Sequence, residues 1–356
     1  MAFLEIKNVI IKGISACVPP TIEENANLPF YSEVEAKKVI DSIGISRRHI
    51  CTDGITASDL CFSAASKLIE DLGWEKESID LIGYVTQNPD YINQPTSFLI
   101  HDKLDLPETC ICMDFFHGCP GWVVGLSGVM SMISSGTIKK ALLLDGDMLS
   151  NDISKNDREA RPLFGDAGTC TALEYKEFAP SVFFNIGTKS KDGKALIRLN
   201  GGYRNQFTME SLKFELDKRD GIIPLNDIAD SMDSMDVFSF AITKVPKNIK
   251  ILCANFDINI TDIDKLVLHQ ANKFMIETIA KKTKFEMDKV PLSLEEYGNT
   301  SSASIPLTIV GTCGGEYASK KVKTLACGFG TGLSWGAVYF ETENIICPKV
   351  IIYEKL

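Results

Sequence analysis

Apolar positions follow two periods along this chain. They recur at helical spacing over about residues 32–43, 56–73, 96–104 and 235–254. Between them lie short apolar runs typical of buried strands, which cover 3–18, 78–87, 137–147, 164–173, 262–270 and 322–328. Strands that alternate with helices predict an α/β protein. The polar residues 151–161 predict an exposed loop, and 180–199 predict a connector with some strand character.

Two parts of the chain carry the same order of elements. The apolar run at 262–270 resembles the run at 78–87, and each follows a helix and a short acidic turn. Matched series of strands and helices indicate internal duplication. The sequence therefore predicts two α/β halves, residues 1–180 and residues 181–356.

The duplication assigns counterparts to the elements that follow. Residues 292–299 take the place of the strand before Cys119, and a helix from about Ser301 matches the helix after it. The next apolar run, 322–328, then corresponds to 139–147.

Cys119 lies where an apolar run gives way to a tight turn and a helix. Pro120 follows it, and proline is favoured at the first helical position. Free N–H groups and the positive end of the helix dipole stabilise a thiolate at such a place, and the thiolate is the nucleophilic form of cysteine. A buried, inert cysteine is the alternative, because cysteines are commonly buried as small hydrophobic side chains.

The composition is that of a globular protein, with 45% hydrophobic and 24% charged residues among 356. A formal net charge of −10 disfavours general binding to nucleic acid. The first residues do not have the pattern of a secretion leader, and no run approaches the roughly 20 apolar residues that span a bilayer. We therefore expect no membrane partner and a location in the cytoplasm.

The eleven cysteines do not form a disulfide-framework pattern. Cys110 and Cys112 are too close for a C-x-x-C turn and lie in an apolar run, which predicts a strand. We expect reduced thiols and no metal site.

Three chemically useful residues occupy related positions in the two halves. His269 corresponds to Val85, and Asn299 corresponds to Cys119. Ends of equivalent strands in two fused halves meet near the pseudo-twofold axis, so Cys119, His269 and Asn299 are predicted to share one pocket. Alone, His269 would more often be structural and Asn299 more often a helix cap. Their joint placement favours catalysis.

Five short motifs follow one another across nearly the whole chain. They are Gly118-Cys119-Pro120-Gly121, Phe164-Gly165-Asp166-Ala167-Gly168, His269-Gln270-Ala271-Asn272, Tyr297-Gly298-Asn299-Thr300-Ser301 and Phe329-Gly330-Thr331-Gly332-Leu333-Ser334-Trp335-Gly336. In this order they resemble the motifs of the ketoacyl-acyl-carrier-protein synthase III family, part of the thiolase-like condensing enzymes. The third and fourth motifs are specific as a pair.

The resemblance implies a fold and an activity. The fold would be a thiolase-like five-layer αβαβα arrangement of two duplicated halves, usually in a homodimer. The activity would be acyl transfer from a thioester to Cys119, followed by decarboxylative condensation with a malonyl thioester to give a 3-oxoacyl product. Acyl-coenzyme A or acyl carrier protein thioesters would be the substrates, and no cofactor would be tightly bound.

The resemblance also implies roles for individual residues. The N–H of Cys119 and one from the turn Gly330-Thr331 would hold the oxyanion formed during acyl transfer. His269 and Asn299 would hydrogen-bond the carbonyl of the malonyl thioester and stabilise the enolate formed as carbon dioxide leaves. Neutral donors suit this step, because they stabilise negative charge without protonating the carbanion.

The chain departs from the family's pattern in three places. Lys38 and Ser42 stand where members that use coenzyme A primers have tryptophan and arginine, which favours a primer bound to carrier protein as an alternative. Gln94 replaces a phenylalanine that caps the partner subunit's acyl pocket, and a polar cap suits a larger or hydroxylated acyl group. Thr331 replaces a glycine, so its side chain narrows the oxyanion turn.

Four lysines form a basic cluster on the predicted helix after His269: Lys273, Lys281, Lys282 and Lys284. A solvated helix face is the simpler interpretation, and docking of acidic acyl carrier protein is the functional one, although Phe274 stands where the family often has arginine. Gln94, Asn272, Lys273 and Lys281 are therefore the candidates for contacts with substrate or carrier protein.

Three other functions compete with condensation. An acyltransferase could use the same acyl-Cys119 intermediate and pass the acyl group to a hydroxyl or amine, forming an ester or amide. The order Cys, His, Asn also occurs in papain-like proteases, but the local signature of those enzymes is absent. A non-catalytic partner subunit is disfavoured because all three polar residues are present.

Overall fold

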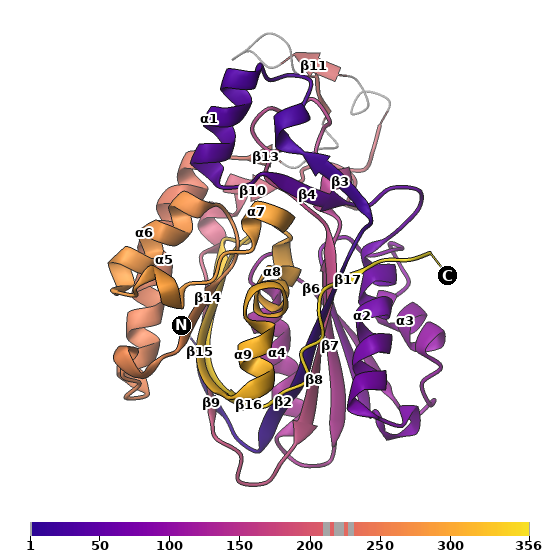
Figure 1. Ribbon diagram of the computed structural model, residues 1–356. Coiled ribbons are helices and arrows are strands. Elements are labelled where there is room, and N and C mark those ends of the chain that lie inside the picture. The colour runs from indigo at the N-terminus through magenta and orange to yellow at the C-terminus, as the bar shows by residue number, and fades with distance from the viewer. Residues whose placement is uncertain (1, 209–213, 217–223, 227–230, 356) are drawn as a thin grey trace.

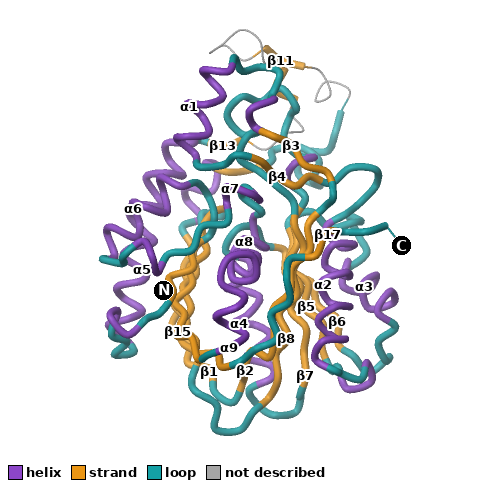
Figure 2. Tube along the Cα trace, viewed as in Figure 1, coloured by secondary structure: helices purple, strands orange, loops and turns teal. Residues whose placement is uncertain are grey.

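The structure, a computed structural model, describes residues 2–208, 214–216, 224–226 and 231–355. Two β-sheets lie on either side of a central layer of helices, and further helices cover the outer face of each sheet (Figure 1). The same layers alternate between helix and strand along the Cα trace in Figure 2. The five-layer αβαβα fold is therefore confirmed.

The two sheets have similar strand orders, β17-β2-β8-β7-β5-β6 in the first and β1-β9-β16-β15-β14 in the second. The first sheet contains β2 (Val9–Val18), β5 (Leu81–Thr86), β6 (Ile111–Phe116), β7 (Lys140–Asp147), β8 (Ala167–Tyr175) and β17 (Ile351–Ile352). The second contains β1 (Ala2–Ile6), β9 (Val182–Thr188), β14 (Lys265–Leu268), β15 (Lys321–Gly330) and β16 (Ser334–Glu343). Three small pairs add β3 (Thr21–Glu24) with β4 (Arg47–Ile50), β10 (Leu196–Ile197) with β13 (Ser231–Met232), and β11 (Phe214–Leu216) with β12 (Pro224–Asn226).

Helices form the other three layers. The central layer contains α4 (Gly121–Ile133), α8 (Ser304–Thr308) and α9 (Gly314–Ser319), with a π-helical turn at Ile309–Cys313 between the last two. The outer face of the first sheet is covered by α2 (Ala57–Leu72) and α3 (Thr96–Leu104). On the other side lie α5 (Ser234–Asn255) and α6 (Lys273–Thr283), with α1 (Glu33–Ile43) above them, and α7 (Leu294–Tyr297) lies just above α8 in the view.

Local sequence signals set the helix ends. At the start of α1, Ser32 and Glu35 form a capping box, in which each side chain accepts a hydrogen bond from the other residue's N–H. Gly44 and Gly73 end α1 and α2 in the left-handed conformation, at φ 75° and 61°. The boundaries predicted for α1, α2, α3 and α5 agree with the structure to within one residue.

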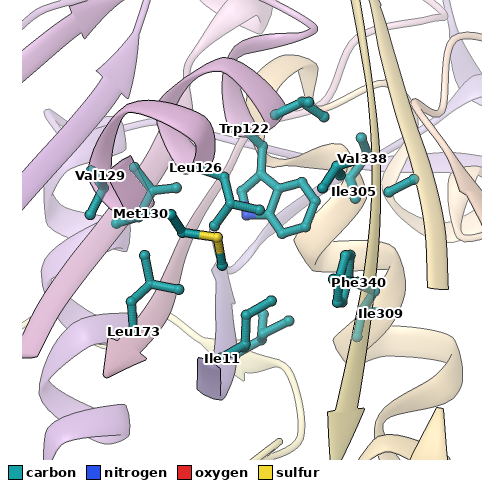
Figure 3. Packing of buried hydrophobic residues seen from close by; sticks show 14 of the residues in the cluster. Ile11, Trp122, Leu126, Val129, Met130, Leu173, Ile305, Ile309, Val338 and Phe340 are labelled. Carbon is teal, nitrogen blue, oxygen red and sulfur yellow. The ribbon is translucent and has the colours of Figure 1, made fainter. Parts of the chain in front are cut away.

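The central helix α4 is strongly apolar and largely buried, and only the side that carries Val124, Gly128 and Ser131 is partly exposed. Figure 3 shows Trp122, Leu126 and Met130 pointing into the space between the two sheets. The Trp122 ring packs edge-on against Phe340 of β16, with ring centroids 6.0 Å apart, and its Nε1–H donates to Thr171 of β8. One side chain of α4 thus contacts both sheets, which fixes the helix that follows Cys119.

The N-terminal run was predicted as one strand, and this prediction is wrong. Asn8, at φ 64°, breaks residues 3–18 into β1 and β2. β1 pairs with β9 of the second sheet, whereas β2 pairs with β8 of the first. The division of the halves at residue 180 remains a prediction.

Residues 292–299 do not form a strand either. They contain the short helix α7, which ends at Gly298 with φ 65°. A Cβ at Gly298 would lie 2.7 Å from Arg48 Cγ, so the turn before Asn299 requires glycine for space as well as for conformation. The periodicity failed here because a single helical turn is too short to have a clear pattern.

One polar segment also differs from expectation. Residues 151–161 were predicted as an exposed loop, yet Ile153, Ala160 and Arg161 are buried. Arg161 forms an ion pair with Glu23 at 2.8 Å, and this carboxylate compensates the buried charge. The strand character predicted for the connector at 180–199 is present as β9 and β10, and β9 lies inside the second sheet. Among the described residues, no helix is long and apolar enough to cross a membrane.

Candidate active site

Cys119 lies in a tight turn between β6 and α4. The N–H of Gly121 donates to the Gly118 carbonyl at 2.7 Å, and α4 begins at Gly121, so Pro120 is the residue that precedes the helix and not its first residue. The Cys119 side chain is buried, with 6% of its surface exposed. The strand-to-helix junction at Cys119 is therefore found as predicted, but the helix begins one residue later than expected.

Burial raises the pKa of the Cys119 thiol to about 11. The Ser301 hydroxyl and the backbone N–H groups of Thr331 and Cys119 lower it, and the nearby Asp147 carboxylate raises it. Desolvation outweighs the donors, so the thiol is protonated at neutral pH in the protein alone. Stabilisation of the thiolate by the helix start therefore remains a prediction.

Ser301 links the three predicted residues. Its hydroxyl donates to Cys119 Sγ over 3.8 Å, and its N–H donates to Asn299 Oδ1 at 2.9 Å. The ring of His269 lies beside the main chain of Ser301. Ser301 itself is fully buried and has φ 51°, an uncommon conformation for a residue with a side chain. Backbone strain of this kind is concentrated at functional sites.

His269 follows β14 directly, and its N–H donates to the Cys327 carbonyl of β15 at 2.9 Å. Its Nδ1 lies 2.7 Å from Ser304 Oγ, and its ring packs edge-on against Phe329 at 5.2 Å. Burial lowers the pKa of the imidazole to about 3, so the ring is neutral at physiological pH. The ring is thus held as a neutral group in a fixed orientation.

Asn299 is held through its main chain by the first half. Its N–H donates to Leu163 O at 2.8 Å, and its carbonyl accepts from Gly165 N–H at 3.1 Å. The side-chain oxygen accepts from Ser301, which leaves the Nδ2 amide as the group available to a ligand. Asn299 therefore forms a local turn with Ser301, but Thr300 and not Asn299 is the cap residue of the helical turn Ser301–Ala303.

A buried carboxylate joins the two halves beneath this site. Asp147, at the end of β7, accepts hydrogen bonds from the main-chain N–H groups of Gln87 and Ser302 at 2.8 and 3.1 Å. The hydroxyls of Thr86 and Ser302 also donate to it. Four donors compensate the buried carboxylate. Asp147 thereby fixes the residue next to Ser301.

The turn at Gly330 and Thr331 approaches Cys119 closely. A Cβ at Gly330 would lie 2.7 Å from Cys119 Cβ and 2.8 Å from its Sγ, so only glycine fits. The same approach brings the Thr331 N–H to the thiol. Binding of an oxyanion by the N–H groups of Cys119 and Thr331 remains a prediction.

A cavity of about 500 Å³ lies near Cys119, which does not line it but neighbours two residues that do, Thr331 and Gln87. Thr331 and Gln87 line its inner end, next to Gly118. Its other walls come from the loops after β5 and β7, from Phe116, and from residues 196–207. A pocket with an apolar wall and a few polar groups is the usual form of a small-molecule site.

The residues predicted to contact substrate or carrier protein lie in different parts of the structure. Gln94 is exposed on the loop before α3, outside the cavity wall. The Asn272 side chain caps α6 by accepting from Met275 N–H at 2.8 Å. Lys273 and Lys281 are exposed on α6. Their contacts with substrate or carrier protein remain predictions.

Known proteins resemble this chain over nearly its whole length. Two family models match it: 3-oxoacyl-[acyl-carrier-protein] synthase III over residues 113–190, and the C-terminal part of the same enzyme over residues 253–342. A beta-ketoacyl-[acyl-carrier-protein] synthase III from Clostridium perfringens is 30% identical over 336 residues, which cover 94% of this chain and 100% of the relative. The crystal structure of a 3-oxoacyl-(acyl-carrier protein) synthase from Burkholderia xenovorans LB400 has a TM-score of 0.91 and 32% identity, and covers 98% of each chain.

The chain belongs to the 3-oxoacyl-acyl-carrier-protein synthase III family. A putative 3-oxoacyl-[acyl-carrier-protein] synthase 3 from Campylobacter jejuni is also similar, at 29% identity over 97% of both chains. The family assignment made from the five motifs is therefore confirmed.

Two residues that hold the candidate site in place, Asp147 and Ser304, were not predicted from the sequence. The role of Asp147 could have been predicted, because a carboxylate at the end of an apolar strand needs hydrogen-bond donors once it is buried. The role of Ser304 could not, since its contact with His269 depends on the folding of a distant helix onto β14. The described residues contain no group of three or more His, Cys, Asp or Glu that could hold a metal ion.

Proposed function

We propose that the protein transfers an acyl group from a thioester to Cys119 and condenses it with a malonyl thioester, which loses carbon dioxide. The observation that carries the proposal is the contact of Ser301 with Cys119, Asn299 and His269 beside a cavity. A nucleophile and two neutral hydrogen-bonding groups within one buried site suit acyl transfer followed by enolate formation.

In the first step, Cys119 Sγ attacks the thioester carbonyl carbon. A new carbon–sulfur bond forms, the old one breaks, and the departing thiolate takes the proton that Cys119 loses. The N–H groups of Cys119 and Thr331 hold the transient oxyanion, because their orientation is fixed before the substrate arrives.

In the second step, the malonyl carbonyl oxygen accepts hydrogen bonds from Asn299 Nδ2 and His269 Nε2. When the Ser304 hydroxyl donates to Nδ1, the ring proton lies on Nε2, which makes this nitrogen the donor. Carbon dioxide leaves, the resulting enolate carbon attacks acyl-Cys119, and the cysteine departs as a thiolate that regains a proton. Because the pKa of His269 is about 3, the ring does not protonate the carbanion.

The proposed partners are acyl carrier protein and a second copy of the chain. β6 is an edge strand of the first sheet, and Phe116 at its end is 78% exposed. A free strand edge with an exposed aromatic side chain beside the cavity favours pairing with another copy. The lysines of α6 supply a positive face for an acidic carrier protein.

Incubation with an acyl thioester, then with malonyl carrier protein, tests the proposal. We expect intact mass to increase by one acyl group, peptide mapping to place it on Cys119, and the Cys119→Ser variant to lose the thioester. Addition of malonyl carrier protein should then release carbon dioxide and a 3-oxoacyl product. Acylation without carbon dioxide release, with transfer to a hydroxyl or amine, would favour the acyltransferase alternative.

A further inference from the structure

The cavity beside Cys119 has a polar side along its length. Gln87, Asn88, Asp152 and Arg198 line it, whereas Ile92, Phe116 and Phe207 line the rest. A plain alkyl chain needs apolar contacts only. A wall with two amides and an ion pair needs a different explanation.

Gln87 is nearest the thiol. Its main-chain N–H donates to Asp147, which fixes the residue, and a Cβ at Gly118 would lie 2.3 Å from Gln87 Oε1. The amide group therefore lies over the residue that precedes Cys119. Among the described residues, no side chain or main-chain group hydrogen-bonds the Gln87 amide, which is half-buried. It can both donate to and accept from a ligand.

The next polar groups along the wall form a network around Asp152. Its Oδ1 lies 2.5 Å from Arg198 Nη2, and its Oδ2 accepts from the Asn88 amide. Asn88 is fixed in turn, because its N–H donates to Thr86 and its Oδ1 accepts from Met148 N–H. The network presents ordered polar atoms without a large excess of charge, since Asp152 and Arg198 neutralise each other.

Hydrogen bonds within the loop at residues 196–207 hold its middle part, residues 199–205, together. Gly201 N–H donates to the Asn205 carbonyl at 2.9 Å, and Asn205 Nδ2 donates to Leu199 O at 3.0 Å. A Cβ at Gly201, where φ is 99°, would lie 2.6 Å from the Phe207 ring, so glycine permits that ring to pack on the loop. The polar and apolar walls are therefore both built features of the cavity.

We propose that the acyl group carried by Cys119 bears a hydroxyl on its chain, and that Gln87 selects it by hydrogen bonding close to the thioester. The inference rests on the proposed acylation of Cys119. An alkyl chain would remove water from the Gln87 amide without replacing its hydrogen bonds, which is unfavourable. A hydroxyl near the thioester replaces them.

The test compares two matched substrates with the full-length protein. Acylation of Cys119 is measured as kcat/KM with hexanoyl-pantetheine and 3-hydroxyhexanoyl-pantetheine. The wild-type protein is expected to prefer the hydroxylated thioester by about tenfold or more, which a single hydrogen bond supplies. Gln87→Leu keeps the main-chain donor and the size of the side chain, and should reduce the ratio to about one, mainly by faster acylation with hexanoyl-pantetheine.

Gln206→Leu is the matched control. Gln206 is exposed on the same loop as Phe207 but is not part of the cavity wall, so its substitution should leave the ratio unchanged. A wild-type ratio near one, with both thioesters acylating Cys119, would overturn the hydroxyl proposal and leave the proposed function intact. No acylation by either thioester, or by shorter and longer pairs, would overturn the proposed function itself.

Discussion

The two sheets share a strand order but end differently at one edge. β5 and β7 pair in parallel and correspond to β14 and β15, and the antiparallel partners β8 and β16 follow in each sheet. Beyond β5, the first sheet adds β6, which leads to Cys119. Among the described residues, no strand lies beyond β14, and the short helix α7 leads to Asn299 instead.

This difference separates two chemical tasks. An edge strand followed by a buried helix places a thiol at a helix start beside the cavity. A helical turn places an amide whose main chain is held by Leu163 and Gly165 of the other half. The first half therefore supplies the nucleophile and supports the donor, and the second half supplies the donors and the Thr331 N–H. The two sheets are similar scaffolds, and the differences at their β6 and β14 edges bring unlike residues together.

Replacement of Cys119, the proposed nucleophile from the first half, should have the largest effect on condensation. Cys119→Ala should abolish acylation and lower condensation by on the order of 10⁴-fold or more, because no other group in the site replaces the nucleophile. Decarboxylation of malonyl carrier protein should persist, because His269 and Asn299 are intact. Carbon dioxide release and product formation are measured separately. Loss of both would show that the two tasks are not separable.

Removing a donor from the second half should give the opposite pattern. Asn299→Ala removes the proposed Nδ2 hydrogen bond to the enolate, so condensation should fall by about 10²-fold or more, the effect of losing one oxyanion donor. Acylation of Cys119 should change little. Acyl-enzyme is quantified by intact mass and condensation by product release. Asn259→Ala, which removes an exposed amide that caps the helical turn Ile260–Asp262, is the control and should retain condensation.

The pH dependence compares Cys119 at the helix start with Cys112, a half-buried thiol on a strand. The pKa of Cys119 is about 11, so its thiolate fraction rises tenfold per pH unit below that value. Alkylation by iodoacetamide should therefore increase about 100-fold from pH 6.5 to 8.5. His269, with a pKa of about 3, should add no inflection in this range. Peptide mass spectrometry measures the rate at each cysteine.

Cys112 on β6 is the internal control for this profile. Burial raises its pKa to about 11 as well, without a helix start next to it. The two thiols should therefore show the same slope with pH. A plateau for Cys119 alone below pH 8 would show that the helix dipole and the Thr331 N–H stabilise its thiolate more than burial opposes it.

A smaller effect on acylation is expected from a substitution at Gly330, where the second half contacts Cys119. Gly330→Ala places a methyl group within 2.8 Å of Cys119 Sγ, so the thiol or the oxyanion turn must move. Acylation should fall by about tenfold, because displaced reacting groups lose their alignment. Gly315→Ala on α9 is the matched control, since a Cβ there meets no atom within 4 Å. Equal acylation rates in both variants would contradict the close approach.

The sequence predicted the parts of this comparison that depend on periodicity and motifs. The ends of α1 and α2, the Cys119 junction and the correspondence of 262–270 with 78–87 follow from local patterns. The helix α7 was not predicted, because one helical turn is too short to show a period of apolar positions. The contact of Ser304 with His269 and the polar wall of the cavity depend on loops that meet only after folding, so no local signal contained them. The raised pKa of Cys119 likewise follows from tertiary burial.

The smallest expected effect concerns the surface of the second half. Lys273→Glu with Lys281→Glu reverses two exposed charges on α6, and should raise KM for malonyl carrier protein several-fold at low salt. The difference should shrink as salt screens the charges. With malonyl-pantetheine, which has no acidic protein surface, kinetics should be unchanged. Lys176→Glu with Lys349→Glu makes the same change of net charge outside α6 and should leave KM as it is. Equal KM values for both double variants would assign the lysines of α6 to a solvated helix face.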